Sequence, residues 1–339
     1  HAVPHGVWCG AHAGVDLTAH RPAMPVHSCQ LILLIKLKNM KSKLLIIVIS
    51  LVAFSCAENQ KNKDESKPLI EGFWNRIGTI QLVNDVPVDT IYVKDTDPNF
   101  KQVKVFKDGN MIWINNQGDS LLPWKGGMGG YGKFKVVSLD SIAELNTNGT
   151  GWWGAQVKNY KDSLNAPGLP VGLKTNIEDK VYSQKNFPEA EYAEFWERMP
   201  NLEEKSKIDG AWKRVYQIAY VNGIAVDTTS VPSDAVLDVK IMSNGHYTYQ
   251  VDQTGMAEPD KPQYGGFGGY GTFKYDSKKN MLIEYGEWGS GTSTNMSPPK
   301  TNPIIHDIQF YNDDMFLQIG KDTLEVNQSG RGLVYKRIK

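Results

Sequence analysis

An internal repeat constrains this sequence more than any other feature. Four blocks recur in the same order, 138 or 139 residues apart, and the matched pairs are Glu71–Ile77 with Asp209–Val215, Asn84–Thr90 with Asn222–Thr228, Gly126–Phe134 with Gly265–Phe273, and Trp196–Met199 with Tyr335–Ile338. Solenoid repeats have periods of roughly 20 to 50 residues, so each copy is long enough to be a complete domain. We therefore predict two domains, at residues 69–200 and 207–339.

Each copy has the pattern of short antiparallel strands. Residues alternate over Ile208–Val221, and Asn222-Gly223 follows, a pair that favours a type I′ turn because both residues need a positive φ. Asp108-Gly109 marks another tight turn. Evenly spaced strands that leave no open edge favour closed up-and-down barrels, so we predict an all-β fold with two tandem antiparallel barrels. Pro188–Met199 is the exception, because proline followed by Glu-Ala-Glu-Tyr-Ala-Glu is typical of a helix start.

Composition excludes several kinds of site. Cys9, Cys29 and Cys56 all precede the domains, which therefore hold no disulfide, thiolate metal site or cysteine nucleophile. Only His246 and His306 of the seven histidines lie after Cys56, too few for a His-rich metal site or a Ser-His-Asp triad in each domain. From residue 56 onward, 32 basic residues stand against 36 acidic ones, which gives no electrostatic reason to bind nucleic acid. We predict a non-enzymatic protein without metal or cofactor.

The segment before the domains has the layout of a signal peptide. Met40–Lys43 carries positive charge, Leu44–Phe54 is apolar, and Ser55 precedes Cys56. The apolar run of eleven residues is too short to span a bilayer core of about 30 Å as a helix. Leu51–Cys56 resembles the loose lipobox of Bacteroidetes lipoproteins, which implies a signal peptide at 40–55 and lipid attachment at Cys56. The alternative is an uncleaved membrane anchor.

Two further segments flank this signal. Residues 1–39 fit neither a signal peptide nor a membrane anchor. We interpret them as extraneous sequence upstream of a start at Met40, with a longer charged region of the signal peptide as the alternative. Residues 56–68 are polar and suit a flexible tether. Lys63-Asp64-Glu65 is similar to the export signal of some Bacteroidetes surface lipoproteins, although it lies farther from the cysteine. We expect the protein to be an outer-membrane lipoprotein of the cell envelope that faces the periplasm or the cell surface.

Both copies share a motif of the lipocalin and calycin barrels. A Gly-x-Trp on the first strand with an Arg on the last resembles the signature of that family, and the closer likeness is to the lipocalin-like domains of Bacteroidetes lipoproteins. The resemblance implies that Trp74 pairs with Arg198 and Trp212 with Arg337, each tryptophan closing a barrel floor under a guanidinium. Such a contact is a cation–π interaction, and the arginine can also bond nearby carbonyls.

The glycine blocks do not match a phosphate-binding loop. They lead into Tyr-Gly-x-Phe, which has the pattern of a strand, whereas a phosphate loop leads into a helix. One interpretation is a glycine flap over the barrel mouth that places Tyr131 or Tyr270 against a ligand. The other is a bulge or bend where the barrel curves and glycine is required.

Aromatic residues are the candidate ligand contacts, because rings can line a cavity for an apolar or sugar ligand. Core packing is the alternative. The candidates are Trp113, Trp124, Tyr131, Trp153, Tyr249, Tyr270, Tyr285 and Trp288.

Six polar residues are weaker candidates. Asp89 and Asp227 occupy equivalent places, where we expect them to bond the backbone of a turn. Glu284 and Glu287 could suggest a glycosidase pair, but we find no matching carboxylates in copy one. His246 adjoins a tight turn and is expected to be exposed, and His306 precedes a strand.

Two functions remain open. The first is a monomeric protein, held to a membrane through Cys56, whose barrels bind a small hydrophobic molecule. The second is an envelope scaffold with filled barrels whose outer surface meets a protein or a glycan. Long inward side chains such as Trp124 and Met128 would favour the scaffold, whereas a void lined by tyrosine and tryptophan would favour binding.

Overall fold

The computed structural model describes residues 70–116, 127–138, 140–150, 169–186, 190–231, 237–252, 266–291, 303–321 and 329–339. The signal peptide, Cys56, the tether, Trp124 and Trp153 lie outside these ranges. No helix in the described part of the chain has the length and apolarity that a membrane span requires.

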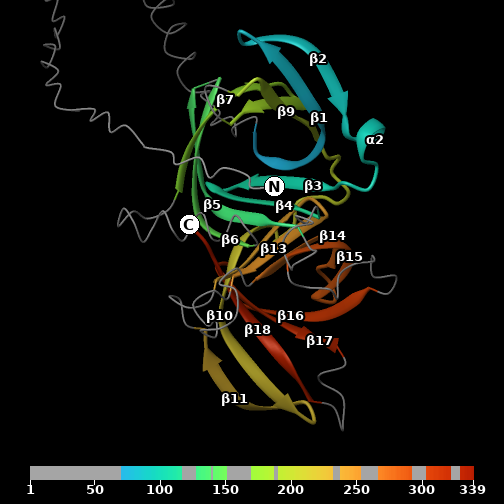
Figure 1. Cartoon of the computed structure of the whole chain (residues 1–339). Helices are drawn as coiled ribbons and strands as arrows, with labels where there is room; N and C mark the ends of the chain where they lie inside the picture. Colours follow the sequence, from blue (N-terminus) through green and yellow to red (C-terminus); the bar gives the residue numbers. More distant parts are fainter. Residues whose placement is uncertain are drawn as a thin grey trace, which may run out of the picture. The chain divides into compact units, whose positions relative to one another are not determined.

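The first copy forms a closed antiparallel barrel (Figure 1), and β1 pairs with both β3 and β9. Its elements are β1 (Gly72–Val83), β2 (Val86–Tyr92), α2 (Val93–Thr96), β3 (Gln102–Lys107), β4 (Asn110–Asn115), β5 (Gly129–Ser138), β6 (Ser141–Thr150), β7 (Leu169–Ile177), β8 (Val181–Lys185) and β9 (Tyr192–Arg198). The barrel contains eight strands, β1 and β3–β9, while β2 pairs with the distal half of β1.

The second copy repeats this topology strand for strand. Its elements are β10 (Gly210–Val221), β11 (Ile224–Ser230), β12 (Leu237–Ser243), β13 (His246–Asp252), β14 (Phe267–Asp276), β15 (Met281–Gly291), β16 (Ile304–Asn312), β17 (Met315–Gly320) and β18 (Ser329–Arg337), with β10 pairing with β18 to close the barrel. The prediction of two tandem all-β barrels is therefore confirmed. Each has the up-and-down architecture that lipocalins also use.

The tight turns adopt the backbone that their sequences indicate. Asn222 and Gly223 have φ values of 53° and 74°, and Asp108 and Gly109 have 49° and 71°. Both central residues of each turn are thus left-handed, as a type I′ hairpin requires. This geometry fixes the register of the flanking strands.

The predicted helix over Pro188–Met199 is wrong, because Tyr192–Arg198 forms the closing strand β9. This strand pairs with β1 on one side and with β8 on the other. Helix propensity is a weak prior, and here strand pairing on both sides together with burial of Ala193 and Trp196 outweighs it.

The floor of each barrel contains the tryptophan–arginine contact that the family signature implies. The Arg198 guanidinium lies 4.2 Å from the ring centroid of Trp74, and Arg337 lies 4.0 Å from that of Trp212. Arg198 also donates to the carbonyls of Glu71 and Asp179, both at 2.6 Å. Both tryptophans are fully buried. In each barrel, the indole ring and the guanidinium that lies over it close this end.

Of the glycine blocks, Gly129–Phe134 lies within β5 and Phe267–Phe273 lies within β14. The register slips by one residue after Tyr131 and after Tyr270. A Cβ on the following Gly132 would collide with the Leu145 carbonyl oxygen, and one on Gly271 with that of Tyr285. The bulge interpretation is therefore correct, because only glycine allows this close approach of two strands.

One hydrophobic cluster contains residues from both barrels. We call it the inter-barrel cluster, and its buried members are Phe73, Val103, Val105, Ile112, Ile114, Tyr131, Ala211, Val239, Ile241, Tyr270 and Trp288. They come from β1 and β3–β5 of the first barrel and from β10, β12, β14 and β15 of the second, of which β10, β12 and β14 correspond to β1, β3 and β5. The two copies therefore pack through corresponding outer faces, and Glu65–Lys339 forms one compact unit.

Candidate functional site

The lumen of the first barrel holds a buried polar triad. Lys104 on β3 donates to the Glu144 carboxylate at 2.9 Å and to the Gln184 amide oxygen at 3.1 Å. None of the three is more than 6% exposed. The Lys104 ammonium also lies 5.5 Å from the ring centroid of Trp196. Since successive strand residues face opposite sides, these three strands place polar side chains in the interior.

The second barrel contains the same triad at corresponding positions. Lys240 on β12 donates to Glu284 at 2.7 Å and to Gln318 at 3.3 Å. The expectation that Glu284 has no counterpart in copy one is thus wrong, because Glu144 is its counterpart. The spacing between equivalent residues changes from strand to strand, as the connecting loops differ in length. A lysine between β-branched residues, in Val103–Val105 and Val239–Ile241, was the available signal.

The remaining polar lumen residues differ between the two barrels. In the first, Arg76 donates to Glu194 at 2.8 Å and to Gln102 at 3.0 Å. In the second, Arg214 lies 3.0 Å from Asp238. Burial raises the pKa of Asp238, and Arg214 and Lys240 only partly offset this. The two lumens therefore share a central triad within different surroundings.

His306 gives the second lumen a further titratable group. It pairs across the sheet with the buried Leu282, and its Nε2 lies 3.4 Å from a Glu284 carboxylate oxygen. Burial alone would raise the pKa of Glu284, but Lys240 and His306 lower it to about 2. The Nδ1 of His306 and the Nε1 of Trp196 in the first lumen have no hydrogen-bond partner. A buried polar group without a partner costs about 1–3 kcal/mol.

The eight candidate aromatic residues fall into four groups. Trp113 and Tyr249 occupy equivalent lumen positions, where both are partly buried and pack against the interior clusters. Tyr131, Tyr270 and Trp288 belong to the inter-barrel cluster instead, so these three rings lie between the barrels and not in a lumen. The sequence of a single strand does not show which of its faces will pack against the other barrel.

Tyr285 follows Glu284 on β15 and so points to the opposite face of that strand. Trp124 and Trp153 lie outside the described residues, so the structure does not place them.

His246 is buried between the barrels, so the expectation that it is exposed is wrong. It is 4% exposed and lies 2.8 Å from the Pro200 carbonyl through Nε2 and 2.8 Å from the Tyr270 hydroxyl through Nδ1. A carbonyl only accepts, so Nε2 carries the proton and Nδ1 accepts from Tyr270. Burial lowers the pKa of His246, although the bond to Pro200 acts in the opposite direction.

Asp89 and Asp227 bond the backbone, as expected, but within strands. Each accepts from the N–H of the next residue, at 2.7 Å and 2.8 Å respectively, beside the bulges of β1–β2 and β10–β11. Both carboxylates are exposed. They have the surroundings of local structural residues.

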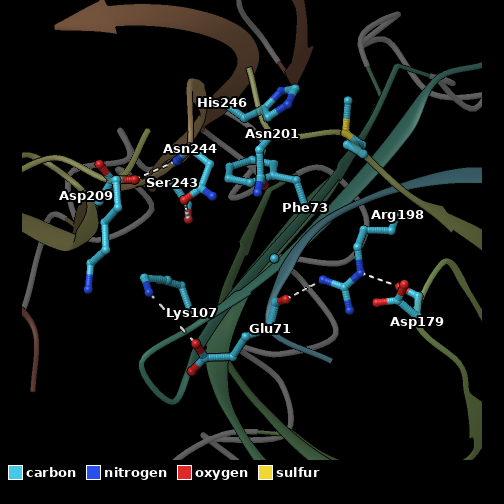
Figure 2. A pocket seen from close by; sticks show the side chains of 13 residues that line it. Glu71, Phe73, Lys107, Asp179, Arg198, Asn201, Asp209, Ser243, Asn244 and His246 are labelled. Atoms are coloured by element: carbon cyan, nitrogen blue, oxygen red, sulfur yellow. Dashed lines mark hydrogen bonds and ion pairs between the residues drawn. The ribbon is translucent and has the colours of Figure 1, made fainter. Parts of the chain in front are cut away.

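A pocket lies where equivalent turns of the two copies meet (Figure 2), with a volume of about 330 Å³. Its lining residues are Glu71, Gly72, Phe73, Lys107, Asp179, Arg198, Met199, Asn201, Lys205, Asp209, Ser243, Asn244 and His246. Within the part of the chain that the structure describes, no group of three or more His, Cys, Asp or Glu residues is arranged to hold a metal ion.

Comparisons with known proteins add little. No protein-family model matches this chain, and no curated protein matches it either. Among solved structures, a lipocalin-like protein from Bacteroides uniformis is 12% identical, with 39% of this chain and 99% of that chain covered and a TM-score of 0.24. A protein of unknown function from Nostoc punctiforme is 8% identical over 80% of this chain and 97% of that one, with a TM-score of 0.19. The fold description therefore rests on the strand pairing given above.

Proposed function

We propose that this protein is a non-enzymatic binding protein that holds a small molecule inside one or both barrels. The observation that carries the proposal is the Lys–Glu–Gln triad, which occupies the lumen of both copies. A buried ion pair is a poor way to gain stability, because apolar residues of equal volume often stabilise a core more. A role in recognition explains why each lumen contains one.

The lumen favours a largely apolar ligand that carries a polar group. Trp113 and Tyr249 offer ring surface in the lumen, where each pairs across the sheet with the lysine of the triad. The Nε1 of Trp196 and the Nδ1 of His306, which have no partner in the protein, offer hydrogen bonds in the interior. A ligand that fills these positions would remove their desolvation cost, since buried polar groups are normally hydrogen-bonded.

Native mass spectrometry of residues 57–339, purified gently and compared with a denatured control, tests this proposal. We expect a reproducible extra mass that is lost on denaturation and that gives the size of the ligand. Trp113→Leu and Tyr249→Leu should each reduce the fraction of bound protein, and Tyr216→Leu, at an exposed site on β10, should not.

A bare polypeptide mass would count against the binding proposal and favour the second function, an envelope scaffold with filled barrels. Equal ligand occupancy in all three variants would show that the ligand lies outside the lumens.

We also propose that a lipid on Cys56 anchors the protein to the outer membrane of the cell envelope. The support is the lipobox-like sequence before Cys56 and the polar segment after it. Cys56→Ala should abolish fatty acylation, which mass spectrometry of the N-terminal peptide detects after expression in a Gram-negative host. The variant protein should be released from the membrane or held only by an uncleaved signal. Fatty acids on the N-terminus of the variant would rule out Cys56 as the attachment site.

A further inference from the structure

The pocket between the barrels has a separate chemistry from the lumens. It has an apolar base, where the rings of Phe73 and His246 have centroids 5.4 Å apart and Met199 lies alongside. Phe73 and His246 are both 4% exposed, and the small exposed part of each side chain faces this pocket. Figure 2 shows Lys107, Arg198 and Asp209 around this base. Ligand sites often form at such interfaces between domains.

Lys107 is a buried cation of this pocket whose contacts with the protein are long. Its side chain is 8% exposed, yet the nearest carboxylate oxygens are 3.4 Å away on Asp108 and 3.8 Å away on Glu71. The Glu71 carboxylate instead accepts the Asp108 backbone N–H at 3.1 Å. An ammonium group has three donors, and burial without hydrogen bonds is costly. The arrangement therefore favours an acceptor from outside the chain.

The charged neighbours already bond to the protein. Asp209 accepts from the Asn244 N–H and from Ser206, which donates both its N–H and its hydroxyl. Arg198 donates to backbone carbonyls but contributes its positive charge to the same wall. Lys205 lies at the exposed rim. These contacts leave Lys107 to receive an anion, with Arg198 and Lys205 nearby.

We propose that this pocket binds a small organic acid. Its carboxylate would accept from Lys107, and its apolar part would pack on Phe73, Met199 and the His246 ring. Ser243, which lines the same pocket, stands at the position equivalent to Lys107 in the second copy, so only the first copy contributes a lysine there. The site requires both barrels, because each contributes part of its wall.

The two histidines after Cys56 allow a direct test. His246 lines the pocket, whereas His306 lies in the second lumen. With ¹³C-labelled histidine in residues 57–339, titration with benzoate at pH 7.5 should shift the His246 ring signals and leave those of His306 unchanged. Benzamide, a neutral molecule of the same shape, should bind at least about tenfold more weakly, since hydrogen bonds to charged groups are the stronger ones.

Lys107→Met should raise the dissociation constant for benzoate about tenfold or more, while both histidine signals keep their folded positions without ligand. Lys174→Met removes the same charge from a side chain that is 66% exposed and should leave the affinity unchanged. Equal binding of benzamide, an unaltered affinity in Lys107→Met, a shift at His306 alone, or no shift at either histidine would each overturn the proposal.

Discussion

Lys104→Met is expected to lower the free energy of unfolding by about 3–5 kcal/mol, because it leaves a buried carboxylate without its cation. Glu144 is 5% exposed, and Lys104 supplies its ion pair at 2.9 Å. Methionine fills much of the same space, so the loss measures the charge and not a cavity. Urea unfolding of residues 57–339 at pH 7.5, followed by circular dichroism, gives this value.

Two further variants test whether the unpaired charge causes this loss of stability. Lys104→Met/Glu144→Gln removes both charges and should recover most of the loss, because no unpaired charge remains. Lys240→Met should cost less than Lys104→Met, since His306 lies 3.4 Å from Glu284 and offers a second partner. A double variant as unstable as the single one would contradict the idea that the unpaired charge causes the loss.

Trp74→Ala is the second large effect, with an expected loss of about 3–5 kcal/mol, the range for removing a buried tryptophan or phenylalanine. Trp74 is fully buried and packs edge-on against Tyr182, with ring centroids 4.7 Å apart. Its Nε1 also donates to the Ile70 carbonyl at 2.7 Å. The change would open the barrel floor. It would also remove the ring on which the Arg198 guanidinium lies. Urea unfolding again measures the loss.

Tyr92→Ala is the control for this variant. Tyr92 is 40% exposed on β2 of the same barrel, and its loss should change stability by no more than about 0.5 kcal/mol. If Trp74→Ala unfolded at the same urea concentration as the wild type, the floor tryptophan would not be a structural plug, and the shared signature would need another explanation.

The barrels and their floors follow from local features of the sequence. The duplication defines two copies, and Asn222-Gly223 and Asp108-Gly109 fix hairpins through backbone conformations that few other residues adopt. The Gly-x-Trp motif and the late arginine lie at opposite ends of each copy, and their pairing follows once the first and last strands close the barrel. Each of these signals depends on residue type and order alone.

The lumen triads, the inter-barrel cluster and the pocket depend on contacts that the sequence does not display. Lys104, Glu144 and Gln184 come from three separate strands, and only closure of the barrel brings them together. In the sequence, His246 has the pattern of an exposed turn residue. In the structure, its ring contacts Phe73 of the first barrel and bonds to the Pro200 carbonyl.

The tertiary structure also overrode local preference in β9, where pairing with β1 and β8 outweighed a helix-forming sequence. The sequence alone therefore determined that this chain builds two barrels with tryptophan floors. Only the tertiary structure decided which outer faces meet and which charges share a lumen. The physical reason is that turn conformation is a local property, whereas burial and ion pairing are set by residues distant in the chain.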